Sequence, residues 1–293
     1  MSYELSDVLA SLDREGTPWM RVGKTTEYRS DRQALRRLLE VPVSQHAPSQ
    51  SGRAAKAVDA WVANEFRRAG FDPDAIWPRA EPPFVLPLDV RNLLHKLTSG
   101  VEKQVAARLL NMPSVAPRDG NFLGRAYVKQ VDVSMSHWST GPELLVSTKM
   151  MTASFGKNLA NRFEEAYGDA GNLRARYPLA AVGFIFVLHA SITTTEPAAF
   201  AKAVDMMRKL RNNGDGNGYT ATCLILVDWD ESQESPVVSF PEAEDPEVDP
   251  SAAHSVPEDL SADRFFEKMV HHILDAAPVS FHAGAREKLN RAR

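Results

Sequence analysis

Three residues near the middle of the chain have types and spacing that could do chemistry together. The stretch ELLVSTKMM, residues 143–151, has the character of an apolar strand and carries Ser147 and Lys149 near its end. Side chains alternate along a strand, so these two residues are expected on the same face. Residues 125–137 also alternate, and a tight turn between the two strands would place Asp132 beside Ser147. The hairpin therefore predicts a metal-binding carboxylate next to a lysine.

Two adjacent glutamates follow on the next predicted helix, residues 154–171. The apolar stripe of this helix consists of Phe155, Leu159, Phe163 and Ala166. Glu164 and Glu165 are displaced from the stripe by similar angles, because successive residues of a helix turn by about 100°. The sequence therefore leaves open which of the two glutamates faces the strands.

The order of these residues resembles the PD-(D/E)XK nuclease superfamily, to which most type II restriction endonucleases belong. The signature of that family is an Asp on one strand, then an acidic residue, any residue and a Lys on the next strand. A Glu often lies on the preceding helix. Asp132 and Lys149 match the two strand positions, and Glu102, in SGVEKQ, matches the helix glutamate. The resemblance covers roughly residues 95–229.

Ser147 occupies the position where the family has Glu or Asp. A branch of the superfamily, which includes restriction enzymes cutting at CCGG-containing sites, also has Ser before the Lys and takes the missing carboxylate from the next helix. Glu164 and Glu165 lie about four helical turns further on, where that replacement is expected. Glu143 lies about 20 Å from Lys149 along the same strand, at about 3.3 Å per residue, and is too far away to share a metal ion.

The resemblance implies Mg²⁺-dependent hydrolysis of phosphodiester bonds in double-stranded DNA. The most direct interpretation is a sequence-specific type II restriction enzyme that works as a homodimer or a higher homo-oligomer, because two-fold protein symmetry matches a symmetric DNA site. Asp132 with Glu164 or Glu165 would bind one or two Mg²⁺ ions. Lys149 would position the attacking water and offset phosphate charge.

Further candidates take supporting roles in this interpretation. Glu102 and Ser147 would support the catalytic site. His137, at the tip of the hairpin, could contact DNA. Arg174 and Arg176, just after the helix with the two glutamates, are equally weak candidates for phosphate contacts.

Each candidate also has a purely structural interpretation. Lys149 can be a strand-end lysine that reaches solvent, and Asp132 an outward-facing strand residue. Glu102, Glu164 and Glu165 can belong to solvated helix faces. Ser147 would also suit a non-catalytic DNA-binding or assembly protein that keeps the fold but has lost the site. A nuclease acting on modified, damaged or branched DNA is a third alternative, because it would have the same catalytic residues.

The elements that must position these residues follow from the pattern of apolar residues. Helices are expected over 31–41, 51–70, 98–112, 154–171, 197–212 and 261–277, and strands over 125–137, 143–151, 179–190 and 219–230. This order predicts an α/β fold in which helices flank a mixed β-sheet, with a restriction-endonuclease-like core. The proline-rich stretch 71–87 is interpreted as a connector.

Four regions are expected along the chain. Residues 1–90 form a mainly helical N-terminal region for DNA recognition or dimerisation, and residues 91–230 form the nuclease core. An acidic linker over 231–260 leads to a C-terminal helix and basic tail over 261–293.

Composition sets broad limits on the function. The chain is 43% hydrophobic and 25% charged, which is typical of a globular protein. Its net charge is −4, but residues 228–259 contain eleven acidic residues and no Lys or Arg, so the remainder is net positive and permits a basic face for a polyanion. The single cysteine, Cys223, excludes an intramolecular disulfide. The longest apolar run, residues 179–188, is about half a bilayer span, so we expect a cytoplasmic protein with no membrane partner.

Overall fold

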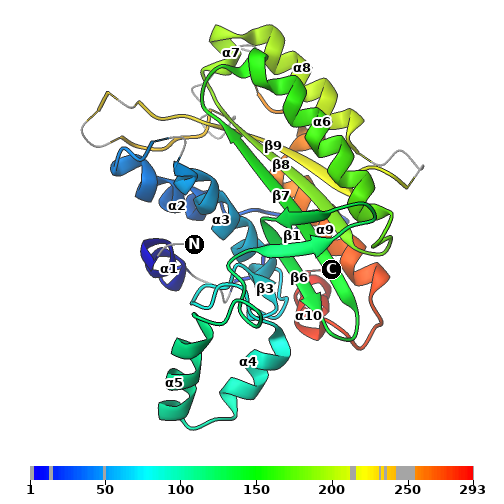
Figure 1. Ribbon diagram of the computed structural model, residues 1–293. Helices are drawn as coiled ribbons and strands as arrows, with labels where there is room; N and C mark the ends of the chain where they lie inside the picture. Colours follow the sequence, from blue (N-terminus) through cyan, green and yellow to red (C-terminus); the bar gives the residue numbers. More distant parts are fainter. Residues whose placement is uncertain are drawn as a thin grey trace.

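A five-stranded mixed sheet forms the centre of the molecule (Figure 1). The computed structural model describes residues 3–12, 16–48, 51–211, 216–230, 232–233, 236–241 and 255–292. In spatial order the strands are β3 (Ile76–Trp77), β6 (Val133–His137), β7 (Gly141–Met151), β8 (Ala181–His189) and β9 (Ala221–Val227). β6 runs antiparallel to both of its neighbours, whereas β7, β8 and β9 are mutually parallel. The expected α/β fold with a mixed sheet is confirmed.

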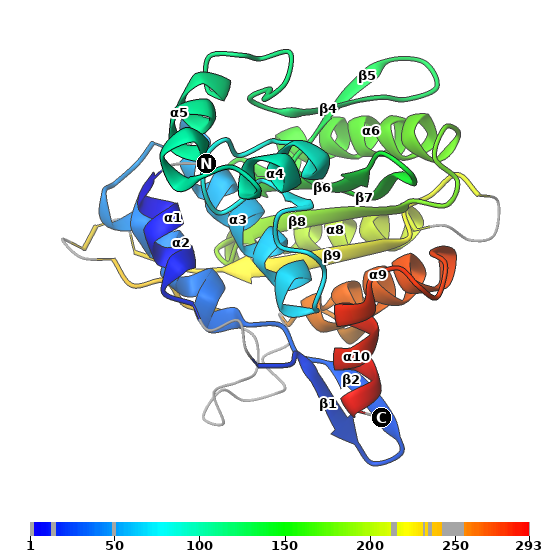
Figure 2. The same ribbon diagram turned by 90° about the horizontal axis from the view of Figure 1, so that it is seen from below.

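Helices cover both faces of this sheet (Figure 2). α3 (Arg53–Arg68) and α9 (Ala262–Ala276) pack on one face, and α6 (Phe155–Arg174) and α8 (Pro197–Lys209) pack on the other. Strand alternation divides β7 between the two cores: Val146 packs on the α3 side and Leu145 on the α6 side. β8 is apolar at nearly every position because both of its faces are buried.

Local signals in the sequence account for where several helices begin. α8 begins with Pro197 in its first turn, where the missing N–H costs nothing. Glu196, just before it, accepts hydrogen bonds from the amides of Phe155 and Gly156 at 3.2 and 2.7 Å and so caps α6 as well. This one carboxylate therefore fixes the start of the helix that carries the two glutamates.

The remaining described elements surround the sheet. They are α1 (Tyr3–Ala10), β1 (Trp19–Val22), β2 (Thr25–Tyr28), α2 (Arg32–Ser44), α4 (Leu88–His95), α5 (Ser99–Leu109), β4 (Gly120–Leu123), β5 (Val128–Val131), α7 (Ile192–Thr195), η2 (Glu258–Leu260) and α10 (Ala283–Ala292). β1 pairs with β2, and β4 pairs with β5, as separate antiparallel hairpins. No helix in the described ranges has both the length and the apolarity needed to cross a membrane.

Several features differ from the sequence-based expectations. The stretch 71–87, expected to be only a connector, contains β3, which pairs with β6 at the edge of the sheet. α3 packs against β6 and β7, so the boundary expected near residue 90 does not separate the sheet from the N-terminal region. Most of the expected basic tail is helical, as α10. Much of the expected acidic linker, including residues 242–254, lies outside the described residues.

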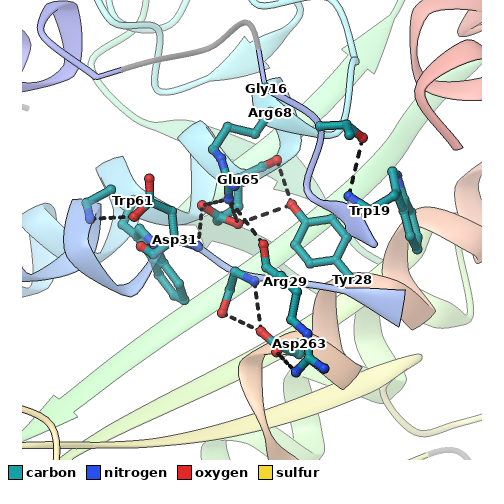
Figure 3. Close-up of polar contacts among 12 residues, drawn as sticks. Gly16, Trp19, Tyr28, Arg29, Asp31, Trp61, Glu65, Arg68 and Asp263 are labelled. Carbon is teal, nitrogen blue, oxygen red and sulfur yellow. Dashed lines mark hydrogen bonds and ion pairs between the residues drawn. The ribbon is translucent and has the colours of Figure 1, made fainter. Parts of the chain in front are cut away.

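A buried polar cluster ties the β1–β2 hairpin to α3 and α9 (Figure 3). The Tyr28 hydroxyl donates to Glu65 Oε2 at 3.1 Å, and Arg68 pairs with the same carboxylate at 2.7 Å. Asp263 of α9 accepts a hydrogen bond from the Ser30 amide at 2.8 Å. Complete burial raises the pKa of Glu65 to about 7, although the charge of Arg68 opposes the rise.

Candidate functional site

Asp132 lies where the strand expected over 125–137 divides in two. β5 ends at Val131 and pairs with β4, whereas β6 begins at Val133 and pairs with β7. The Asp132 amide still donates to the Val146 carbonyl at 3.1 Å. Because β5 leaves the main sheet at this point, the Thr148 amide of β7 donates instead to Asp132 Oδ2 at 2.9 Å. The divergence of the strands therefore turns the Asp132 carboxylate toward β7.

Thr148 also connects β7 to a buried acid on α3. Its hydroxyl donates to Asp59 Oδ1 at 2.5 Å, and Lys56 lies 3.1 Å from the other carboxylate oxygen of Asp59. Asp59 is only 1% exposed. Burial, followed by the charge of Asp132, raises the pKa of Asp59 to about 6, against the opposing effect of Lys56. Two carboxylates, those of Asp59 and Asp132, are thus held close together by one threonine.

Lys149 contacts the opposite helix layer, because it follows Thr148 in the alternation of the strand. Its Nζ lies 3.4 Å from Glu165 Oε1 on α6. Lys129 of β5 lies 3.3 Å from the same oxygen, and Arg162 lies 3.2 Å from Glu165 Oε2. Partial burial raises the pKa of Glu165, but Lys149 and Lys129 outweigh this effect and leave it below its usual range. Glu165 therefore joins the candidate lysine to two further cations.

Asp169, one helical turn after Glu165, completes this side of the site. It lies 2.5 Å from Lys129 Nζ and accepts a hydrogen bond from the Tyr127 hydroxyl at 2.9 Å. Burial lowers the pKa of Lys129, but the contacts with Asp169 and Glu165 more than compensate, so the pKa lies above its usual value. The lysine of β5 is consequently charged and held in place.

The structure distinguishes the two adjacent glutamates of α6. Glu165 faces Lys149, whereas Glu164 is exposed on the outer side of the helix. Ser147 shares the α6 face of β7 with Lys149 and is 4% exposed. Ser147, Lys149 and Glu165 therefore lie together on the α6 side of β7. Asp132 contacts Thr148 instead and lines the same small cavity as Lys56.

Glu102 is not brought to these residues. It pairs with Arg91 NH1 at 2.7 Å, and this ion pair joins α5 to α4. The helix that packs on β6 and β7 is α3 rather than α5. The helix acid that contacts β7 is therefore Asp59 of α3, in place of Glu102. The role expected for Glu102 at the site is not supported by its position.

The three weak DNA-contact candidates lie away from this cluster. His137 ends β6, about 17 Å along the strand from Asp132, and contacts Ser139 at 2.7 Å. Arg174 is about 13 Å along α6 from Glu165, and it donates to the Ala180 carbonyl at 3.0 Å. Arg176 is exposed and lies over the Tyr177 ring. Arg174 thus has a structural role in closing the α6–β8 connection.

These residues could supply only some of the ligands that a Mg²⁺ ion needs. Within the described ranges, no group of three or more His, Cys, Asp or Glu side chains could hold a metal ion. The carboxylates of Asp59 and Asp132 are hard oxygen donors near each other. The Lys56 ammonium pairs with Asp59, and the charge of Asp132 also acts on it. Mg²⁺ in phosphate-processing sites is often held by one or two carboxylates together with substrate phosphates. This pair supplies oxygen donors of the right type for such an ion, although Thr148 and Lys56 already contact the two oxygens of Asp59, and Glu165 is neutralised by three cations.

Cavity size does not identify the site. Asp132 and Lys56 line a cavity of only about 50 Å³, and a cavity of about 520 Å³ lies elsewhere, at the carboxyl ends of β7, β8 and β9. A nucleic-acid backbone is bound on charged surfaces and in grooves, so the small cavity volume beside Asp132 does not argue against a nucleic-acid ligand at this site.

Asp59 and Lys129 are among the residues of this cluster that were missed in the sequence, as are Lys56 and Asp169. Asp59 lies in the apolar stretch VDAWVA. A single carboxylate among apolar helix residues could have indicated it, because a buried carboxylate needs a partner. Lys129 alternates with apolar residues in a strand and carries no comparable signal. Comparisons of the chain with protein-family models, with curated proteins and with solved structures find no match.

Proposed function

We propose that this protein is a Mg²⁺-dependent endonuclease of the PD-(D/E)XK type that hydrolyses phosphodiester bonds in double-stranded DNA, most specifically a type II restriction enzyme. The observation that carries the proposal is the contact set of β7. Thr148 holds Asp132 and Asp59, and the adjacent Lys149 reaches Glu165. Two acids held by one strand residue, with a lysine next to it in the chain, are the kinds of group that metal-assisted phosphodiester hydrolysis requires.

The order of elements supports the same proposal. α3 precedes the sheet, β6 and β7 form an antiparallel hairpin, and α6 then crosses to β8, which runs parallel to β7. This matches the order implied by the resemblance, with α3 in place of the helix that contains Glu102. Ser147 departs from the family pattern, which has an acidic residue at this position. Glu165 of α6 is the carboxylate that would take the place of the missing acid.

Each residue has a defined task in this mechanism. Asp59 and Asp132 would hold Mg²⁺, which supplies Lewis-acid polarisation of the phosphate and a more acidic water. Thr148 fixes both carboxylates through its hydroxyl and its amide. By the resemblance, Lys149 would orient the attacking water and offset the charge that develops on the phosphate, from the face of β7 opposite to Asp59. Glu165 positions the Lys149 ammonium from α6.

A second candidate is a non-catalytic DNA-binding protein with the same fold. Ser147 favours it, because the family carboxylate is missing from β7. The ion pairs of Glu165 favour it as well, since three cations already neutralise the carboxylate that would replace the missing one. The two candidates differ in a single measurable property, which is cleavage.

The test is cleavage of a long, unmodified DNA of known sequence by the purified protein with Mg²⁺. Lys149→Ala and Asp132→Asn are compared with Lys268→Ala, which removes an exposed lysine of α9, on the face of the sheet opposite to Lys149. We expect discrete fragments with the wild-type protein and with Lys268→Ala, and their loss in EDTA and in both site variants. Cleavage that survives Lys149→Ala would place the active site elsewhere. DNA binding without any cleavage would favour the non-catalytic candidate.

A further inference from the structure

A second feature of this molecule is a peripheral unit, residues 88–131, which we call the basic arm. It contains α4, α5 and the β4–β5 hairpin, and Leu94, Leu109 and Ala116 form a small core together with Leu86, which lies just before the arm. Figure 2 shows the arm along the same side of the molecule as α6. The β4–β5 hairpin of the arm packs with α6, on the side of the sheet where Lys149 meets Glu165, whereas α4 and α5 lie at the other end of the molecule from α6 (Figure 1).

The charge of the basic arm differs from that of the whole chain. It contains seven Lys or Arg residues and three Asp or Glu residues, in a protein whose net charge is −4. Five of these cations are exposed, and none of the five is joined to a carboxylate within the described part of the chain; they are Lys96, Lys103, Arg108, Arg118 and Arg125. Many other surface cations have acidic partners, as Arg208 and Arg264 do. An unpaired group of this kind is suited to an anionic ligand.

The arm is continuous with the candidate site. Arg118 lines the same small cavity as Asp132 and Lys56. The hairpin of the arm carries Lys129, whose ammonium lies 3.3 Å from Glu165. A ligand bound along the exposed cations would therefore extend directly to the residues assigned to hydrolysis.

We propose that the basic arm binds the phosphate backbone of double-stranded DNA and holds it across the site. This inference rests on the proposed function for the identity of the polyanion. Lysine and arginine contacts to phosphates displace condensed counterions, which gives sequence-independent affinity that falls with salt. The arm positions the duplex in this way without reading its bases.

A protein partner is the main alternative occupant of this surface. The arm exposes apolar side chains as well, including Leu93 at 60% and Val128 at 59%. Exposed apolar side chains also occur on α5 and β4 and between the elements, so both kinds of side chain recur along the arm. What distinguishes the arm is its excess of Lys and Arg over Asp and Glu. Charge is therefore the property that favours DNA over an apolar protein surface.

The experiment measures binding of a fluorescent 30-base-pair duplex in EDTA, so that cleavage does not interfere, between 50 and 200 mM salt. The arm variant combines Lys96→Gln, Lys103→Gln and Arg108→Gln. A matched control combines Lys24→Gln, Lys202→Gln and Lys268→Gln, which removes the same charge from exposed positions outside the arm. We expect the arm variant to bind at least about tenfold more weakly, with a plot of log K against log salt that is shallower by about 2.7, since each phosphate contact contributes about 0.9.

Equal binding by the arm variant and the control would overturn the inference, and so would a wild-type protein that does not bind duplex DNA. Arg118→Gln with Arg125→Gln provides a second variant, should the first fail to fold, and circular dichroism checks both. Weakened binding in the arm variant of a protein that never cleaves DNA would support the arm and reject the nuclease. Cleavage of DNA by the wild-type protein, with binding unchanged in the arm variant, would support the nuclease and reject the role of the arm. Loss of self-association alone would assign the arm to a second copy of the chain.

Discussion

Replacing Glu65 with glutamine tests the electrostatics of the buried cluster shown in Figure 3. Glu65 has no exposed side-chain surface and contacts Tyr28, Arg68 and the Asp31 amide. Burial raises its pKa from 4.5 to about 7. The folded state therefore binds a proton more tightly than the unfolded state does, and the stability supplied by Glu65 is fully present below pH 4.5 and is lost as the pH rises through about 7.

The size of this effect follows from the same two values. A rise from 4.5 to about 7 corresponds to on the order of 3 kcal/mol, at about 1.4 kcal/mol for each pH unit. Glutamine is close in shape to a protonated glutamate and does not titrate. Glu65→Gln should therefore gain on the order of 3 kcal/mol relative to the wild-type protein between pH 4.5 and pH 8. Comparing the two proteins cancels the titration of Asp59, whose pKa is also raised, to about 6.

The assay is urea denaturation followed by tryptophan fluorescence at a series of pH values, with the free energy of unfolding obtained by linear extrapolation. Glu81→Gln, at an exposed position in the proline-rich stretch, is the matched control and should follow the wild-type curve. If Glu65→Gln keeps the pH dependence of the wild-type protein, Glu65 does not titrate with a raised pKa and the reasoning fails.

Two further substitutions test the packing around the sheet. Thr148→Val keeps the branched shape but removes the 2.5 Å hydrogen bond to buried Asp59, and it should lower the free energy of unfolding by about 2 kcal/mol in urea denaturation; an unchanged midpoint would contradict this contact. Gly183→Ala would place a Cβ 2.7 Å from the Phe265 ring and should cost about 1–3 kcal/mol. The control Gly171→Ala, in a helix with open space around the added atom, should be neutral or stabilising, and equal effects of the two would refute the packing argument.

Alternation and spacing in the sequence were sufficient to predict the sheet and the relation between its central strands. β7 and β8 are buried on both faces, and continuous apolar runs are typical of such strands. The short hairpin turn brought Asp132 beside β7, where the Thr148 amide donates to it, although a bulge between Met135 and Ser136 shifts the register of the hairpin. These features depend on neighbours in the chain, which is why the sequence alone could determine them.

Helix rotation and helix packing depended on the tertiary structure. Glu164 and Glu165 lie at similar angles from the apolar stripe, so only the position of α6 over β7 decided that Glu165 meets Lys149. The sequence equally could not show that α3, rather than α5, packs on β6 and β7, because a helix pattern gives the apolar face but not the sheet it covers. For that reason Asp59 replaces Glu102 beside the site, and a two-residue strand in a proline-rich stretch joins the edge of the sheet.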